Sequence, residues 1–291
     1  MTGDGVEPHG AVLDVAAPAK VNLFLHVVGR RGDGYHLIES LFALVDLADR
    51  VRVTLREDGR VLRERELPGV PAEGDLAIRA ARALQAATGT SLGASIAVTK
   101  RIPMGSGLGG GSSDAASVLL ALNRLWKTGL PRQALAEVGL KLGADVPFFV
   151  MGEHAFVRGI GERIGAVSLP RWWIALATPP VAVSTAGVFA AADLTRSTPS
   201  AKMEVFSEGY GRNDLEAVAA ARFVEVARAA SAMRALVPHA RMTGSGSCVI
   251  AACATFARAS QAVAALPSEV TGQVVRILAR HPLAGPPWAG A

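Results

Sequence analysis

The sequence predicts an α+β protein built from two domains, and three observations support this. Short segments of alternating polarity are interspersed with segments of helical periodicity, as at residues 15–28 and 113–125. A glycine-rich stretch at residues 103–113 joins a strand pattern to a helix pattern. The chain has 291 residues, which suits two medium domains, and its character changes near Gly159-Ile-Gly161. We therefore divide the chain into residues 1–158 and 159–291.

The composition argues against several classes of protein. Half of the residues are hydrophobic, yet no apolar run of about 18 residues occurs, and no basic segment precedes an apolar one at the N-terminus. We expect a cytoplasmic protein with no membrane partner. Cys248 and Cys253 share one predicted strand and the six histidines are scattered, so the sequence indicates neither a disulfide framework nor a metal site built from these residues.

The charge bears on possible partners. The net charge is +5, but basic residues alternate with acidic ones and form no long run. An anionic small molecule explains this charge at least as well as a nucleic acid does, so we expect a small-molecule substrate and no nucleic acid. The sequence is compatible with both a monomer and a homodimer.

The glycine-rich stretch is the strongest signal in the chain. Glycine occupies positions 105, 107, 109, 110 and 111, and an apolar helical pattern follows immediately. Because ordered glycine costs more conformational entropy than any other residue, such a cluster needs a compensating role. A helix N-terminus with bare backbone before it favours anions. We therefore predict a phosphate-binding loop, with Ser112 or Ser113 as the helix N-cap.

Other glycine signatures fit this loop less well. A dinucleotide-binding motif needs an acidic residue about 20 positions later, where Leu130 stands. A Walker loop needs a lysine after its last glycine, where Ser112 and Ser113 stand. The lysine must therefore come from elsewhere in the chain. The remaining alternative is a glycine-rich connection that binds no ligand.

The other elements follow from periodicity and from glycine or proline breaks. In the strand at residues 15–28, alternation places Lys20 and Asn22 on one face. The apolar neighbours of Lys20 would desolvate its ammonium group, which then requires an anionic partner. An edge-strand lysine that discourages aggregation is an equal alternative. Further strands are predicted at 51–55, 94–98, 172–177 and 248–252, and helices at 77–87, 132–142 and 215–232.

Three further stretches attract attention. Asp145 is a carboxylate among apolar residues that either caps a short helix or meets a cation, for which Lys20 is the natural candidate. Tyr35 and His36 close a glycine-containing loop and suit a planar heterocycle, although a packed loop tyrosine is commoner. A second glycine loop at residues 243–247 is either structural or abuts the first.

Together these motifs resemble the GHMP kinase family. The motifs that carry the resemblance cover almost the whole chain in family order: residues 18–25, 33–36, 103–113, 142–147, 213–216 and 241–246. The resemblance implies a two-domain GHMP kinase fold, with an N-terminal ATP-binding domain like ribosomal protein S5 and a C-terminal α/β sandwich. Within that family, the sequence resembles the kinases that phosphorylate the 2-hydroxyl of cytidine diphosphate methylerythritol on the non-mevalonate route to isoprenoids.

The resemblance also implies site residues, with ATP and Mg²⁺ as cofactors. Lys20 and Asp145 would be catalytic, Asp145 as the general base. Asn22, Tyr35, His36 and Phe189 would bind substrate, and Ser112 and Ser113 would lie at the metal. The ATP phosphates would lie on the loop and helix start: Pro103, Met104, Gly105, Ser106, Gly107, Leu108, Gly109, Gly110, Gly111, Ser112 and Ser113.

Three positions depart from the family pattern. Ser106 replaces a usual glycine, Asp114 a common asparagine, and Gly74-Asp75 a frequent Asp-Asn. Asp75 puts the family's adenine contact in question. Two other functions compete with this one: another GHMP kinase of the homoserine or mevalonate type, and a basic nucleic-acid-binding protein without turnover.

Overall fold

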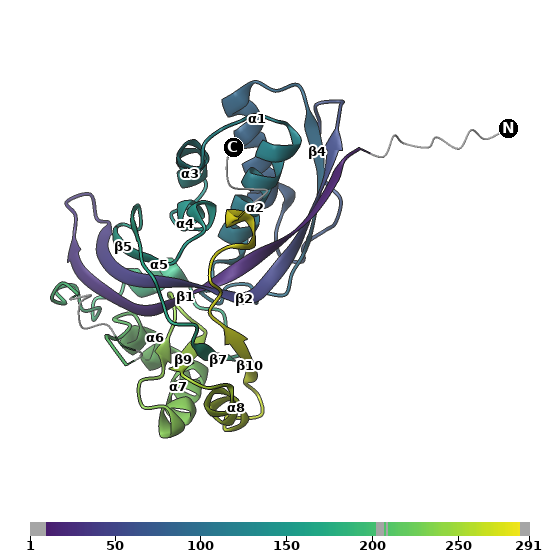
Figure 1. Ribbon diagram of the computed structural model, residues 1–291. Coiled ribbons are helices and arrows are strands. Elements are labelled where there is room, and N and C mark those ends of the chain that lie inside the picture. Colours follow the sequence, from purple (N-terminus) through teal and green to yellow (C-terminus); the bar gives the residue numbers. More distant parts are fainter. Residues whose placement is uncertain (1–9, 202–206, 208, 286–291) are drawn as a thin grey trace.

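The computed structural model describes residues 10–201, 207 and 209–285. Within them two sheets lie one above the other, each with helices on one side, and a long hairpin runs between them (Figure 1). The α+β class is confirmed. No helix among the described residues is long and apolar enough to cross a membrane.

The first sheet is organised around that hairpin. Its strands β1 (Val12–Arg30) and β2 (His36–Arg56) pair antiparallel, and the register shifts between Pro18 and Lys20 and again after Asn22. The predicted strand at 51–55 is therefore the end of a much longer one. The order is β3-β4-β2-β5-β6 with β1 on β2, and the shorter strands are β3 (Val61–Arg63), β4 (Gly93–Thr99), β5 (Ala155–Gly159) and β6 (Arg163–Ala166).

Four helices pack on the first sheet around its hydrophobic core. The central one, α2 (Gly110–Leu125), contacts both β1 and β2 and is buried from Ser113 to Asn123. Its apolar side chains pack in the first core, where the helix also contacts α1 and α4. The others are α1 (Leu76–Thr88), α3 (Arg132–Leu140) and α4 (Val146–Met151), with a 3₁₀ turn at Ala72–Gly74 before α1.

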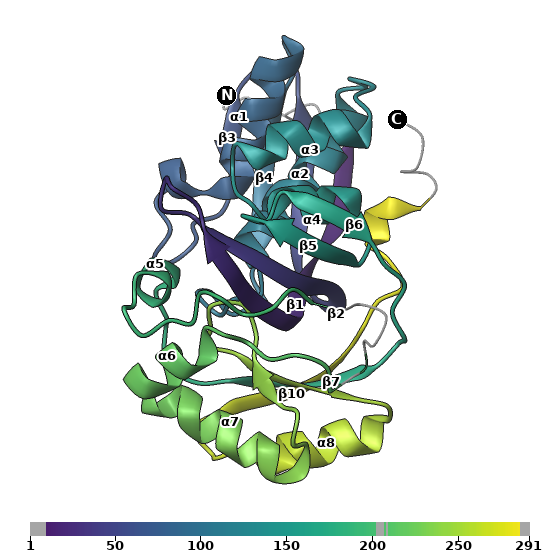
Figure 2. The ribbon, with the colours of Figure 1, turned by 90° about the vertical axis from the view of Figure 1, so that its left-hand side faces the viewer.

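The second sheet is antiparallel in the order β10-β7-β9-β8. Helices α7 and α8 cover its outer face, and α5 and α6 lie beside the hairpin (Figure 2). The strands are β7 (Trp173–Thr178), β8 (Arg241–Met242), β9 (Val249–Cys253) and β10 (Thr271–Arg276). The helices are α5 (Thr185–Phe189), α6 (Glu216–Arg222), α7 (Val224–Leu236) and α8 (Phe256–Ala264).

Two local predictions are wrong. The long helix expected at 215–232 is two helices, because Phe223 adopts an extended conformation (φ −128°, ψ 100°) and packs against the core of the second sheet. The N-cap of α2 is Gly109 in the left-handed region (φ 74°), not Ser112 or Ser113, because the helix starts inside the glycine run. Both cysteines are free and buried.

The two halves of the chain are tied together in both directions. Strand β6 lies beyond residue 158 yet pairs with β5 in the first sheet. A 3₁₀ turn at Pro282–Ala284 returns to the first core, where Leu283 is buried and His281 N donates to Gly152 O at 2.8 Å. The division into residues 1–158 and 159–291 stays a prediction.

Candidate active site

The first glycine loop packs backbone to backbone against the second. Gly105, Gly107 and Gly109 have positive φ angles of 66°, 78° and 74°. A Cβ on Gly107 would lie 2.8 Å from Thr243 O, and a Cβ on Gly244 would lie 2.6 Å from Gly107 O. The expectation that the two loops abut is confirmed. The glycines are therefore required by the loop–loop contact as well as by the turn.

The loop delivers its chain to the N-terminus of α2. Gly110, Gly111 and Ser112 head this 16-residue helix, whose first N–H groups have no partner within it. Gly111 is exposed and Ser112 half-buried. Ser113 is fully buried, and its hydroxyl donates to Pro18 O at 2.7 Å. The part of the helix start that faces solvent is thus made of bare glycine backbone and one serine hydroxyl.

The residues predicted for the ATP phosphates range from exposed through half-buried to fully buried. Met104, Gly105 and Gly111 are exposed, whereas Leu108 is fully buried in the interior and accepts the Lys20 backbone N–H at 3.0 Å. Ser106 is also buried and donates its hydroxyl to Pro103 O at 2.6 Å. It has no positive φ, so its backbone is unstrained.

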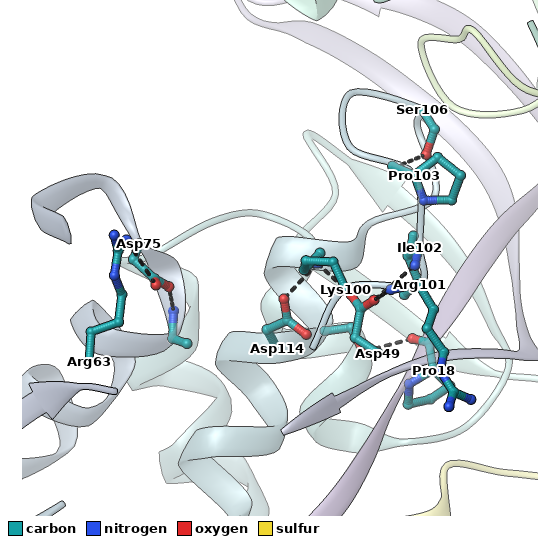
Figure 3. Close-up of polar contacts among 12 residues, drawn as sticks. Pro18, Asp49, Arg63, Asp75, Lys100, Arg101, Ile102, Pro103, Ser106 and Asp114 are labelled. Atoms are coloured by element: carbon teal, nitrogen blue, oxygen red, sulfur yellow. Dashed lines mark hydrogen bonds and ion pairs between the residues drawn. The ribbon is translucent and has the colours of Figure 1, made fainter. Parts of the chain in front are cut away.

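A buried charge cluster anchors the base of the loop (Figure 3). Asp49 Oδ1 accepts the backbone N–H groups of Arg101 at 2.5 Å and Ile102 at 2.8 Å. Lys100 Nζ joins this carboxylate to Asp114 Oδ2, at 2.8 Å from the latter. Burial and the neighbouring Asp49 raise the pKa of Asp114 to about 7, despite the pull of Lys100. One ammonium group does not neutralise two buried carboxylates.

Sequence reasoning missed Asp49 and Lys100. It did state that a loop without its own lysine must borrow one. Lys100 Nζ would lie 3.1 Å from a Cβ on Gly110, the first residue of α2. The position of Lys100 just before the loop was the available signal. The sequence around Asp49 carries no local pattern that separates this buried carboxylate from the surface carboxylates of the chain.

Lys20 lies on the other side of the loop with its side chain 5% exposed. Its Nζ donates to Asn22 Oδ1 at 2.6 Å, which confirms that the two residues share a face of the strand. The ammonium group also lies 4.5 Å from the centre of the Phe42 ring. Asn22 is fixed in turn by a 2.7 Å bond from Nδ2 to Ser40 Oγ. This burial excludes the alternative that Lys20 is an edge-strand lysine whose role is to discourage aggregation.

Asp145 lies opposite Lys20. Its Oδ2 is 3.5 Å from Lys20 Nζ, and its side chain is 31% exposed. Asp145 stands at the N-cap position of α4, but its side chain makes no capping hydrogen bond. Its carboxylate is therefore not used as a helix cap. A buried ammonium group and a solvent-accessible carboxylate meet at one point, next to the glycine loop.

Both groups line a cavity of about 820 Å³ between the two halves of the molecule. Gly107, Gly109 and Gly244 border it on the loop side, and Tyr35, His36 and Phe189 border it on the far side. The His36 and Phe189 rings lie 5.1 Å apart at 35°. Tyr35 is 61% exposed. The structure thus brings residues from both predicted domains together around one space.

Arg196 is a further lining residue that the sequence did not single out. Its Nε donates to His36 Nε2 at 3.1 Å. The pKa of His36 is lowered by partial burial and by the nearby charges of Arg196 and Arg30. His36 is therefore held neutral at physiological pH. A basic residue in a polar, proline-containing loop gave no pattern from which this contact could be predicted.

The position that departs most from the family pattern, Asp75, has a structural role here (Figure 3). It caps α1 by accepting the Ala77 N–H at 2.9 Å, and it lies 3.6 Å from the Arg63 guanidinium. Its side chain is 6% exposed. The Asp75 carboxylate is thus already bound by Ala77 and Arg63 of the protein itself.

Comparison with known proteins agrees with this geometry. A family model described as "GHMP kinases N terminal domain" matches residues 75–153, and one described as "GHMP kinases C terminal" matches residues 196–271. The chain belongs to the GHMP kinase family. The resemblance drawn from the motifs is confirmed, and with it the two-domain GHMP kinase fold and the ATP-dependent small-molecule kinase activity.

Individual relatives narrow the comparison. A protein of Cupriavidus taiwanensis named 4-diphosphocytidyl-2-C-methyl-D-erythritol kinase is 53% identical over 95% of this chain and 97% of its own length. One of the same name from Thiobacillus denitrificans is 54% identical over 92% and 96%. A crystal structure of 4-(cytidine 5'-diphospho)-2C-methyl-D-erythritol kinase superimposes with a TM-score of 0.80 at 36% identity, covering 91% of this chain and 99% of that one.

Other solved members of the family share the fold alone. A homoserine kinase of Cytophaga hutchinsonii gives a TM-score of 0.68 at 16% identity and covers 97% of this chain and 98% of its own. At that identity the likeness carries no information about the substrate. The relatives at about half identity carry the name of the cytidine diphosphate methylerythritol kinase, whereas the homoserine kinase shares only the fold. This difference favours the cytidine diphosphate methylerythritol kinase over the two competing functions.

Proposed function

We propose that this kinase transfers the γ-phosphoryl group of ATP to the 2-hydroxyl of 4-diphosphocytidyl-2-C-methyl-D-erythritol, giving the 2-phosphate and ADP. This step belongs to the non-mevalonate route to isoprenoid precursors, and we place it in the cytoplasm. The relatives at about half identity over nearly the whole chain support the substrate. The observation that carries the chemistry is the Lys20–Asp145 pair at the floor of the cavity, beside the glycine loop.

Asp145 acts as the general base in this proposal. Its carboxylate is partly exposed to the cavity, and no capping bond holds it. It would accept the proton of the acceptor hydroxyl as the phosphoryl group is transferred. Phosphoryl transfer depends mainly on positioning and on charge stabilisation, so a single well-placed base suffices for the protein's part of the proton transfer.

Lys20 positions that base and stabilises charge. Its side chain is buried and held by Asn22, so the ammonium group does not reorganise during the reaction. It lies within reach of the Asp145 carboxylate and borders the same cavity. A fixed cation at that place stabilises both the carboxylate and the negative charge that develops on the transferred group.

The ATP phosphates would lie against the start of α2. The backbone of the exposed Gly105 and Gly111, together with the first N–H groups of the helix, which have no partner within it, is suited to bind an anion. Lys100 lies against Gly110, and its ammonium group is held there by Asp49 and Asp114. The buried members of the loop, Ser106 and Leu108, would support its shape without contacting the nucleotide.

Mg²⁺ would be held mainly by the ATP phosphates, whose charge it neutralises. No group of three or more histidine, cysteine, aspartate or glutamate side chains among the described residues forms a metal cage. Mg²⁺ in kinases typically binds few protein groups beside phosphate oxygens. A site made of ATP phosphate oxygens and one serine hydroxyl therefore suits this ion. Of the two predicted serines, we place the ion at Ser112, because Ser112 is half-buried whereas Ser113 is fully buried.

The cytidine base would be held at the far side of the cavity. Tyr35 is exposed next to His36, and His36 and Phe189 form a ring pair from opposite halves of the molecule. Base–aromatic stacking contributes about 1–3 kcal/mol per base. Asn22, which also borders the cavity, would contact the part of the substrate near the reacting hydroxyl.

The test is direct. Purified protein is incubated with ATP, Mg²⁺ and a panel of acceptors: 4-diphosphocytidyl-2-C-methyl-D-erythritol, homoserine and mevalonate. Mass spectrometry should detect a phosphorylated product from the first acceptor only. Turnover of homoserine or mevalonate, or the absence of any ATP consumption, would contradict the proposed function.

A further inference from the structure

Arg196 connects two parts of the proposed cytidine site. Its Nε donates to His36 Nε2 at 3.1 Å. Its two terminal nitrogens donate to the chain just after α5, to Leu194 O at 3.0 Å and to Ala191 O at 2.5 Å, with a longer bond to Phe189 O at 3.5 Å. Each of the three guanidinium nitrogens thus has a partner within the protein.

These contacts decide what Arg196 does in the cavity. A guanidinium group occupied in this way is not free to bind the substrate diphosphate. It instead fixes the end of α5, which carries Phe189, relative to the loop that carries His36. Because the two rings lie only 5.1 Å apart, the same side chain holds both walls of this part of the cavity.

The contact with His36 has a chemical consequence. Guanidinium nitrogens only donate hydrogen bonds, so His36 Nε2 must accept with its lone pair. An imidazole that accepts at Nε2 is neutral and carries its proton on Nδ1. Burial and two nearby arginines lower the pKa of His36 and keep the ring neutral. The Nδ1–H group is then the ring donor left for a ligand.

We propose that Arg196 is a positioning residue that fixes the Nδ1–H tautomer of His36 and so makes the site select cytosine over uracil. The proposal rests on the proposed function and extends it to the basis of pyrimidine discrimination. Cytosine N3 is an acceptor, whereas uracil N3 carries a proton. A ring donor that cannot change its tautomer pairs with cytosine and is repelled by uracil.

Without Arg196, His36 would be able to adopt either tautomer. It would donate to cytosine through one nitrogen or accept from uracil with its proton on the other. Stacking on Tyr35 and Phe189 does not separate the two bases, since every base has a π-face. Discrimination therefore depends on the group that prevents the switch.

The first test reads the tautomer without any substrate. Protein labelled with ¹⁵N-histidine is examined by long-range ¹H–¹⁵N correlation at pH 8, and His36 is assigned by its loss in His36→Gln. The parent should show a protonated Nδ1 and an unprotonated Nε2. Arg196→Met should shift the ring toward Nε2–H, and Arg196→Lys, which restores a donor, should return it. A protonated Nε2 in the parent overturns the proposal even if the variants do not fold.

The second test measures kcat/KM for the cytidine substrate and its uridine analogue. Arg196→Met should reduce the preference for cytidine by about tenfold or more, the effect of one discriminating hydrogen bond. The change should lie in KM, with kcat for the cytidine form within about twofold of the parent, because His36 lies away from the reacting group. On a logarithmic scale of the cytidine-to-uridine ratio of kcat/KM, Arg196→Lys should recover at least half of the preference that Arg196→Met loses.

The matched control is Arg222→Met. Arg222 also bonds to α5, by donating to Gly187 O at 3.0 Å, but it does not contact His36. This variant should keep the parental preference and the parental tautomer. Equal losses on both substrates in Arg196→Met would show a merely structural arginine and overturn the proposal. If the parent phosphorylates neither substrate, the proposed function has failed, whereas the tautomer measurement still decides the role of Arg196.

Discussion

Two lysines flank the glycine loop, and their surroundings differ. Lys100 joins two carboxylates, Asp49 and Asp114, whose side chains are 0% and 5% exposed. Lys20 is more deeply buried, yet it faces a single carboxylate, Asp145, which is 31% exposed and 3.5 Å away. The first lysine is held between two buried carboxylates, whereas the second borders a cavity.

The difference teaches how one loop can be both rigid and reactive. A buried carboxylate that accepts backbone N–H groups fixes the backbone, as Asp49 does for the N–H groups of Arg101 and Ile102. A charge pair that is incompletely satisfied and open to a cavity remains available to a reacting group. The contrast predicts that mutation affects a different property in each cluster. Changes at Asp145 should alter turnover, whereas changes at Asp49 and Asp114 should alter stability.

The largest effect is expected for Asp145→Asn. Loss of the general base should lower kcat by roughly 100- to 10,000-fold. The melting temperature should stay near that of the parent, because Asp145 makes no capping hydrogen bond and the ion pair that is lost is partly exposed. Single-turnover phosphoryl transfer and thermal unfolding measure the two quantities. Lys20→Met serves as the companion variant and should also reduce kcat. Near-parental turnover in folded Asp145→Asn would show that the Lys20–Asp145 pair is not the reactive one of the two clusters.

The next effect is expected for Asp49→Ala. The change leaves the N–H groups of Arg101 and Ile102 unpaired and leaves Lys100 with one carboxylate, so the free energy of unfolding should fall by about 3–5 kcal/mol. Urea unfolding at pH 7 measures this loss. The matched control is Asp46→Ala, which removes a carboxylate of the same strand that accepts one exposed hydrogen bond, from Arg276 N at 2.8 Å. If the two variants lose the same stability, Asp49 is not the anchor.

Asp114 sharpens the contrast through pH. Because its folded-state pKa is raised from 3.8 to about 7, the folded protein holds a proton that the unfolded chain has lost between these values. This carboxyl group therefore lowers the free energy of unfolding as pH rises from about 4 to about 7.

Asp114→Asn removes that dependence and still offers Lys100 an oxygen. The free energy of unfolding of this variant, measured relative to the parent, should increase across the same pH window and level off above it. Urea unfolding at a series of pH values checks this. Histidines contribute equally to both proteins, so parallel curves would show that Asp114 is not the titrating group.

The smallest effect is expected for Ser106→Gly. The serine hydroxyl donates to Pro103 O, and its φ needs no glycine. Its replacement loses that bond and frees the unfolded backbone, so the free energy of unfolding should fall by about 1 kcal/mol. Thermal unfolding and nucleotide titration measure the result. A higher melting temperature with tighter ATP binding would show that the family's usual glycine relieves strain here.

Much of this protein was determined by the sequence itself. The glycine run, the polar alternation around Lys20 and the apolar periodicity of α2 are local patterns, and they predicted the loop, the strand and the helix that the structure contains. The pairing of Lys20 with Asn22 on one face also followed from strand geometry alone. Local signals suffice where an element's own periodicity decides which side is buried.

Tertiary structure decided the contacts between distant segments. Lys100 and Asp49 are 51 positions apart, and Arg196 and His36 are 160 apart, and neither pair has a spacing that a sequence reveals. The break at Phe223 and the start of α2 directly after Gly109 were likewise set by packing that overrides local propensity. The physical reason is the same in each case. Hydrogen bonds and ion pairs depend on distance in space, which the fold sets and which local residue patterns do not record.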